Sequence, residues 1–142
     1  MKGKFFIDTN ILLYLFSDTE SDKRNKVKSY LKSISPQNTV TWSTQVIQEF
    51  YQVMTSKFGK DPQKVKSAIK QFSAFELNVN NLETIEHAID IQTLHLLSFW
   101  DSLVISAAFQ SNCTILLTKD LNHGQKINNV LIHNPLKDEV NI

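Results

Sequence analysis

Four acidic residues stand where carboxylates from separate parts of the chain could share one site: Asp8, Glu49, Asp101 and Asp120. Asp8 directly follows the apolar segment Lys4–Ile7, and Asp120 follows Thr114–Thr118 with one residue between. Both segments have the length and composition of buried strands. The two acids are therefore expected at the carboxyl ends of strands, the edge that forms the ligand crevice in open α/β sheets.

The other two acids have helical spacing. Glu49 stands between Val46 and Val53, at i+3 within the series i, i+3, i+7. Asp101 is followed by apolar residues three, four and seven positions later, in the first turn of an expected helix. Residues at these spacings share a helix face, so both carboxylates are predicted to project beside an apolar stripe and to face inward.

Each acid also has a purely structural alternative. Asp8 and Asp101 could cap helices, Asp120 could be a turn residue, and Glu49 could pair with a lysine. For any single residue the structural role is the more common one. Four acids that are inward-facing or at the crevice edge, on separate elements, favour a shared site.

Carboxylates gathered in this way would need a counter-ion. Two of them about 5 Å apart repel by roughly 3 kcal/mol at an effective dielectric constant near 20. Hard divalent cations with oxygen ligands, Mg²⁺ or Mn²⁺, relieve that repulsion. Such ions bind phosphate oxygens, lower the pKa of a bound water and stabilise an in-line displacement.

Alternating strand-like and helix-like segments position these acids, and their order is typical of one α/β domain over residues 1–142. The expected strands are Lys4–Ile7, Thr39–Trp42, Phe75–Val79, Thr114–Thr118 and Val130–His133. The expected helices are Ile11–Phe16, Ser21–Ile34, one from Ser43 or Thr44 towards Gly59, one from Pro62 to about Phe72, one from Asn81 or Leu82 through Leu94, and one from about Trp100 to Gln110. Strands separated by helices imply a parallel sheet.

Composition limits the functional classes. The chain has 142 residues, 42% of them hydrophobic, and a formal charge of +1, so bulk electrostatics cannot make it a nucleic-acid binder. Its single cysteine, Cys113, cannot form an intramolecular disulfide, which favours a reduced, cytoplasmic location. The longest apolar run, Ile11–Phe16, is too short for a membrane span or an export signal.

The charge is segregated along the chain. Residues 21–70 hold ten basic and three acidic residues, whereas residues 71–118 hold five acidic residues and no lysine or arginine. Two interpretations of this basic block stay open. Its lysines are either phosphate contacts beside the acids or a solvated helix face.

Four segments carry a family resemblance: Ile7–Asn10, Gln48–Phe50, Phe99–Ala108 and Leu117–Gln125. Together they resemble the PIN-domain ribonucleases and, more narrowly, the VapC toxins of bacterial toxin–antitoxin pairs. The resemblance extends over nearly the whole chain. It implies a PIN-like three-layer fold, with a central, mostly parallel sheet of four to five strands flanked by helices.

The same resemblance implies a metal-dependent endoribonuclease that hydrolyses RNA phosphodiester bonds and leaves a 5′-phosphate. Its catalytic and Mg²⁺ or Mn²⁺ ligands would be Asp8, Glu49, Asp101 and Asp120. Supporting roles fall to Thr9, Asn10, Thr118 and Asn122, as groups that position an acid or hold a water. The partners it implies are an RNA substrate, a small antitoxin and a second copy of the chain in a homodimer.

Two other functions are alternatives to this one. A non-catalytic PIN-like module would keep the fold and bind RNA or protein through the basic block. An aspartyl-phosphate enzyme would use Asp8, but no second acid stands two residues later. His123, three residues after Asp120, could touch a phosphate or serve only as a loop residue.

The remaining polar and aromatic residues are expected to be structural. Glu83, Glu86, His87 and Asp90 are predicted to form a solvated helix face. Phe99 and Trp100 adjoin an inward-facing helix and are expected in the core.

Overall fold

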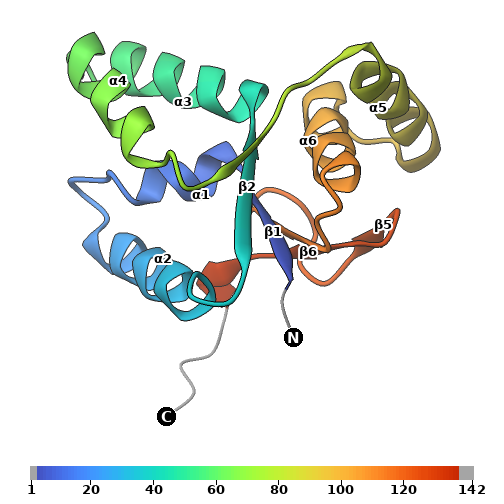
Figure 1. The fold of residues 1–142 in the computed structure, drawn as a ribbon, viewed down its shortest axis with the longest axis horizontal. Coiled ribbons are helices and arrows are strands. Elements are labelled where there is room, and N and C mark those ends of the chain that lie inside the picture. Colours follow the sequence, from blue (N-terminus) through green and yellow to red (C-terminus); the bar gives the residue numbers. More distant parts are fainter. Residues whose placement is uncertain (1–2, 138–142) are drawn as a thin grey trace.

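A six-stranded sheet crosses the centre of the molecule in the computed structural model, which describes residues 3–137 (Figure 1). Its strands lie in the order β3-β2-β1-β4-β6-β5. Their bounds are β1 Lys4–Ile7, β2 Thr39–Ser43, β3 Glu76–Asn78, β4 Ile115–Leu117, β5 Lys126–Ile127 and β6 Val130–His133. All neighbours pair in parallel except β5 and β6. The predicted α/β fold with a mostly parallel sheet is confirmed.

The sheet has one strand more than the four to five expected. The additional strand, β5, has two residues and pairs antiparallel with β6. Asn128 and Asn129 join the two strands with φ values of 49° and 66°. Two left-handed residues make the tight hairpin turn that fits the twist of antiparallel strands, and asparagine tolerates that conformation. A two-residue strand carries no periodicity, so the sequence pattern missed it.

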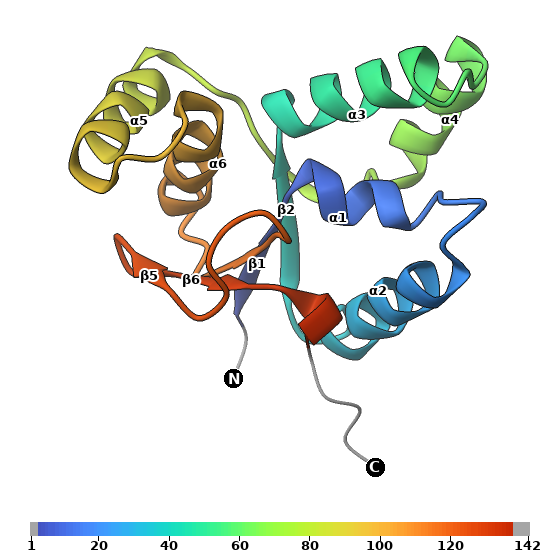
Figure 2. The same ribbon diagram turned by 180° about the vertical axis from the view of Figure 1, so that it is seen from behind.

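Helices cover both faces of this sheet and make three layers. Their bounds are α1 Thr9–Tyr14, α2 Ser21–Ile34, α3 Thr44–Ser56, α4 Pro62–Gln71, α5 Leu82–His95 and α6 Phe99–Gln110, with a 3₁₀ turn at Pro135–Lys137. Figures 1 and 2 show α1 to α4 on one side of the central strands and α5 with α6 on the other. In residues 3–137 no helix is long and apolar enough to span a membrane.

Polar residues at the helix starts fix where the helices begin. The Ser43 hydroxyl accepts from the Val46 N–H, and Ser98 does the same for Asp101. Asp61 accepts from two N–H groups of the first turn of α4, and Asn81 forms a capping box with Thr84. Each of these caps satisfies N–H groups that have no partner within the helix.

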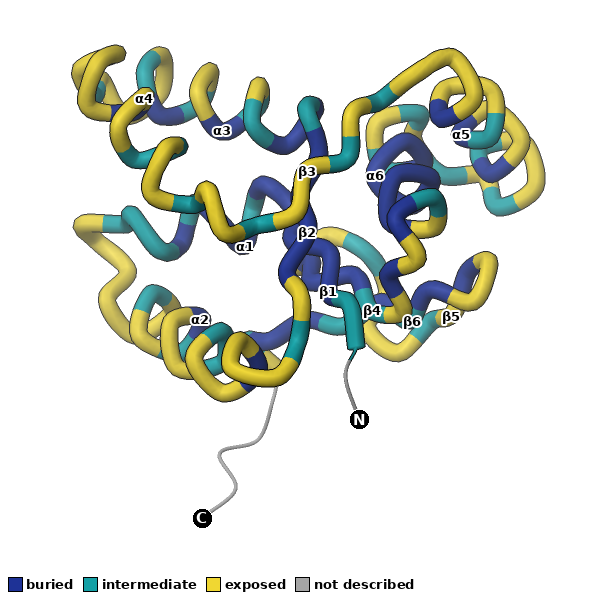
Figure 3. The backbone as a smooth tube through the Cα atoms, viewed as in Figure 1, coloured by how far each residue is buried: buried dark blue, intermediate teal, exposed yellow. Residues whose placement is uncertain are grey.

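The core lies between the central strands and the helices on both faces. Phe6, Ile7, Leu116 and Leu117 of β1 and β4 are fully buried, as is Ile105 of α6. Figure 3 shows the buried backbone concentrated in these strands and along α6, while the outer turns of α2 and α5 are exposed. The central strands and α6 therefore form a rigid base for the residues at their ends.

His87 departs from the predicted solvated face. Its Nδ1 lies 3.1 Å from Ser106 Oγ, its Nε2 lies 3.1 Å from Asn128 Nδ2, and its ring packs on Phe109. The prediction was wrong for this residue because α5 packs along α6, which brings position 87 against its neighbour. The other members of the predicted face, Glu83, Glu86 and Asp90, are exposed.

Candidate active site at the carboxyl edge of the sheet

The chain changes direction across the sheet between β1 and β4. Strands β2 and β3 continue to one side of β1, whereas β4 and β6 lie on the other. Asp8 follows β1 at this point, Thr118 and Asp120 follow β4, and α3 begins directly after β2. A reversal of strand order opens a crevice at the carboxyl ends of the strands.

A cavity of about 550 Å³ lies at this edge, and all four predicted acids line it: Asp8, Glu49, Asp101 and Asp120. Thr9 and Asn10 also line it. Leu13, Val53 and Val104 supply apolar wall. Residues separated by more than a hundred positions are thus brought to one cavity by the strand order.

Asp8 is the most deeply buried of the four acids, with 7% of its surface exposed. Its Oδ1 accepts from the Thr9 N–H (2.7 Å) and its Oδ2 accepts from Thr118 Oγ1 (2.9 Å). Its pKa is raised to about 7, chiefly by burial and to a smaller extent by the charges of Glu49 and Asp101, while these two hydrogen bonds lower it. Asp8 therefore loses its proton near neutral pH when no cation is bound.

Glu49 is held by the neighbouring strand-to-helix turn. Thr9 Oγ1 donates to Glu49 Oε1 at 2.9 Å. The family resemblance implied that Thr9 would position Asp8 or a water. In the structure its backbone N–H contacts Asp8, while its side chain contacts Glu49, so one residue links both acids.

Asn10 and Thr118 connect the turn after β1 to the segment after β4. Asn10 Nδ2 donates to Asp120 Oδ2 (2.7 Å) and to Thr118 Oγ1 (3.3 Å). Asn10 Oδ1 accepts from the Lys119 N–H at 3.3 Å. Asp120 is exposed, so this amide is what fixes its carboxylate.

Asn122 and His123 lie apart from this network. Asn122 Nδ2 donates to Gln125 Oε1 at 3.4 Å, within its own loop. His123 Nδ1 accepts from the Asn134 N–H at 2.9 Å. Neither residue lines the cavity. The structure thus gives Asn122 a turn contact in place of the predicted supporting contact, and gives His123 a loop-anchoring contact.

Trp100 and three glutamines also line the cavity, although they were not predicted there: Gln45, Gln48 and Gln52. The expectation that Trp100 belongs to the core was wrong, since 61% of its surface is exposed. The first turn of α6 borders the cavity at the edge of the sheet and does not lie over the sheet itself. On α3, Gln45 and Gln52 stand four residues before and three residues after Glu49, and Gln48 stands three and four residues from those two glutamines. That helical spacing was the available signal.

The donors around the cavity are suited to a hard cation. The four acids offer only oxygen, with neither a thiolate nor an imidazole beside them in the cavity lining, which is the ligand chemistry of Mg²⁺ and Mn²⁺. Within residues 3–137, no three carboxylate, imidazole or thiol side chains converge closely enough to hold an ion directly. Coordination by these acids requires side-chain rotation or bridging waters, and Mg²⁺ commonly keeps several waters.

Part of the basic block borders the acids. A second groove shares Asn10 and Leu13 with the acid cavity and is lined by Lys57, Lys60 and Lys119. This placement supports the phosphate-contact interpretation for Lys57 and Lys60 of the basic block, whereas Lys28 and Lys32 of α2 line a different groove.

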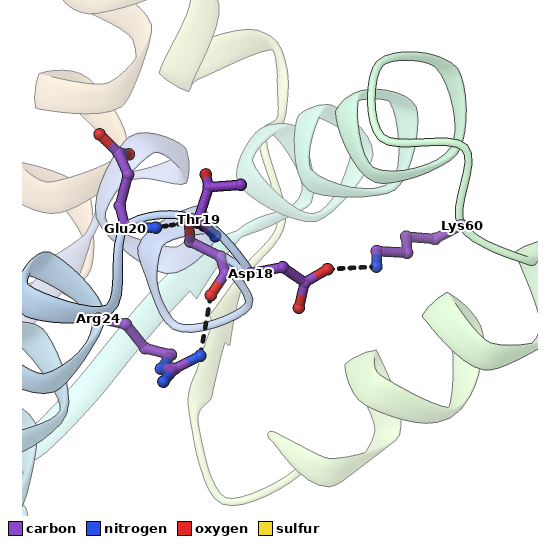
Figure 4. A network of polar contacts seen from close by, with 6 residues as sticks. Asp18, Thr19, Glu20, Arg24 and Lys60 are labelled. Carbon is purple, nitrogen blue, oxygen red and sulfur yellow. Dashed lines mark hydrogen bonds and ion pairs between the residues drawn. The ribbon is translucent and has the colours of Figure 1, made fainter.

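Two basic residues near this groove also stabilise the loop between α1 and α2. Lys60 Nζ pairs with Asp18 Oδ2 at 2.7 Å, and Arg24 Nη1 donates to the Ser17 carbonyl at 3.0 Å (Figure 4). The Lys60 ammonium lowers the pKa of the Asp18 carboxyl. The loop is thereby tied both to α2 and to the connection between α3 and α4.

Comparisons with solved structures find the same fold in several proteins. The chain is similar in structure to Mycobacterium tuberculosis VapC20, a sarcin–ricin loop cleaving toxin (18% identity, TM-score 0.69, 82% of this chain and 89% of that one). It is also similar to a Klebsiella pneumoniae toxin–antitoxin complex chain (22%, 0.69, 92% and 96%) and to one of VapBC2 from Rickettsia felis bound to promoter DNA (20%, 0.69, 92% and 98%).

Similarity at these identities establishes the fold. A search of curated proteins finds no match. The sequence pattern of the PIN domain matches residues 5–126, which is most of the chain and includes all four acids. The chain belongs to the PIN domain family.

Proposed function

We propose that the protein is a metal-dependent endoribonuclease and acts as the toxin of a VapBC-type toxin–antitoxin pair. The observation that carries this proposal is the convergence of Asp8, Glu49, Asp101 and Asp120 on one cavity at the strand-reversal edge. Three of these acids are oriented by hydroxyl or amide groups of the segments that follow β1 and β4. Such support distinguishes a built site from an incidental patch of acids.

The residues of the site have two different roles, ion binding and orientation of the carboxylates. A bound Mg²⁺ or Mn²⁺ would supply an activated water and neutralise charge on the phosphate. Asp8, Glu49, Asp101 and Asp120 would hold that ion, directly or through water. Thr9, Asn10 and Thr118 keep the carboxylates oriented so that little reorganisation accompanies the reaction.

The adjoining groove fits the substrate's other phosphates. Lys57 and Lys119 line it, and neither ammonium has a carboxylate oxygen within 4.0 Å among residues 3–137. An RNA strand whose reacting phosphate lies over the acids would bring a neighbouring phosphate to these lysines. The net charge of +1 is then the sum of a basic surface and an acidic site.

A small antitoxin and a second copy of the chain are the proposed protein partners. The similar structures include a toxin–antitoxin complex from Klebsiella pneumoniae and VapBC-1 from nontypeable Haemophilus influenzae. We infer the same kind of partner here. Co-purification of a small protein encoded beside this gene would support the assignment.

The test of the nuclease activity is incubation of purified protein with labelled, structured RNA and Mg²⁺ or Mn²⁺. We expect cleavage with metal, none after chelation, and recovery when excess Mn²⁺ is added back. Chelator-resistant cleavage would contradict the metal mechanism. The alternative, a non-catalytic binding module, predicts that RNA is retained and uncut under every metal condition.

A further inference from the structure

Trp100 is an exposed indole beside the acid cavity. It exposes 61% of its surface, whereas Trp42, the other tryptophan, exposes 4% and packs among Phe72 and Phe75. A large exposed apolar side chain is informative, because burial of an indole is strongly favourable. Trp100 also lines the same cavity as the four acids and directly precedes Asp101 in α6.

The backbone that carries this indole is fixed. Gln45 Nε2, from α3, donates to the Trp100 carbonyl at 3.3 Å, and Gln45 is itself 5% exposed. Ser98 caps the same helical turn through the Asp101 N–H at 3.0 Å. The backbone at Trp100 is therefore anchored beside the cavity, as a binding platform requires.

The indole faces have no parallel stacking partner among residues 3–137. Phe99 meets Trp100 with ring centroids 5.2 Å apart and planes at 71°, which is an edge-to-face contact. Sequence-tolerant RNA sites commonly present such faces to nucleobases. The electroneutral indole also offers contact area beside carboxylates that would repel a phosphate.

We propose that Trp100 stacks on a nucleobase next to the phosphate held at the four acids and so positions the RNA at the site. This inference rests on the proposed nuclease function and adds to it a residue that contacts a base. In a duplex each base is covered on both faces by its neighbours, so a base must be unstacked before the indole can cover it. Loops, bulges and single strands offer such bases.

Tryptophan fluorescence tests the contact in an Asp101→Asn background, which is expected to keep RNA uncut with Mg²⁺ present. Because Trp42 is buried, quenching by added RNA reports mainly on Trp100. We expect single-stranded RNA to quench emission and a blunt duplex of the same sequence to quench it much less. Trp100→Leu should abolish the quenching.

The RNA affinity of matched variants provides the second test and its control. Removing one base–aromatic stack should weaken single-stranded RNA binding by about 5- to 150-fold. Trp100→Phe should recover part of the loss. Phe109→Leu changes another exposed aromatic of α6, one that packs on His87 and lies outside the cavity lining, and should bind like the parent.

Two results would overturn the stacking proposal. One is equal RNA binding by the parent and Trp100→Leu. The other is shielding of Trp100 from iodide in the RNA-free protein that increases with protein concentration, because a second copy of the chain would then cover the indole. These results can be distinguished from those that would refute the nuclease proposal. Weakened binding by Trp100→Leu with no cleavage by the unmutated protein refutes the nuclease alone, and normal cleavage by Trp100→Leu refutes the stacking alone.

Discussion

Asp8→Asn is expected to stabilise the metal-free protein by an amount that grows between about pH 4 and pH 7 and then levels off. The pKa of Asp8 is raised from 3.8 to about 7 in the fold, chiefly by burial. Each unit of such a shift corresponds to about 1.4 kcal/mol, so the ionised carboxylate costs the fold a few kcal/mol. Asparagine has no charge to bury and avoids that cost.

The direction follows from proton binding. Between about pH 4 and pH 7 the folded protein keeps the proton on Asp8, whereas the unfolded chain has lost it. Rising pH therefore favours unfolding in this range. Below pH 4 Asp8 is protonated in both states and does not reduce the stability of the fold. The loss of stability grows from pH 4 and is complete once the pH has passed 7. Asparagine also weakens the contacts with Thr9 and Thr118, which reduces the gain without changing its pH dependence.

Thermal unfolding in chelator at several pH values measures this difference. Asp90→Asn is the matched control, because Asp90 is exposed on α5 and the substitution should not change the pH profile. Profiles for Asp8→Asn and the unmutated protein that run parallel from pH 4 to pH 8 would show that Asp8 is not a buried, high-pKa acid.

Asp101→Asn is expected to reduce metal-dependent RNA cleavage by at least about 100-fold, equivalent to about 2.7 kcal/mol of transition-state stabilisation. The amide keeps the size of the side chain but removes a charge that would help to hold the cation. Asp101 is partly exposed, and its carboxylate has no hydrogen-bond donor among the described residues, so folding should be little affected.

Cleavage rates at saturating Mn²⁺ test this loss, with thermal unfolding run alongside to show that the variant is folded. Glu86→Gln removes an exposed carboxylate on α5 and should cleave at the unmutated rate. Full activity in Asp101→Asn would remove this residue from the proposed ion-binding set.

The sequence predicted most of the fold because its signals are local. The helix Ser21–Ile34 has the predicted bounds, and α3 begins after its predicted cap Ser43. The first helix starts at Thr9 rather than at the predicted Ile11, because the Asp8 carboxylate accepts from the Thr9 N–H. The four acids lie together because each follows a strand or shares a helix face with apolar residues, and both features are visible in the chain.

The contacts that the sequence could not predict depend on tertiary packing. Thr9 contacts Glu49, forty positions away. Thr118 donates to the distant Asp8 carboxylate in addition to accepting from the nearby Asp120 N–H. Trp100 is exposed because the first turn of α6 meets a cavity, a fact of position rather than of residue type. Asn122 bonds within its loop because the chain turns back after β4.

The central claim is that the four acids bind a divalent cation, and the most direct test is the shift in melting temperature produced by Mn²⁺. A ligand at 100 times its dissociation constant stabilises the folded state by about 2.7 kcal/mol. We predict a clear increase for the unmutated protein at pH 8, a smaller one at pH 6 where Asp8 is largely protonated, and a much weaker one for Asp120→Asn. An unchanged melting temperature at millimolar Mn²⁺, or an equal increase in Asp120→Asn, would contradict the account.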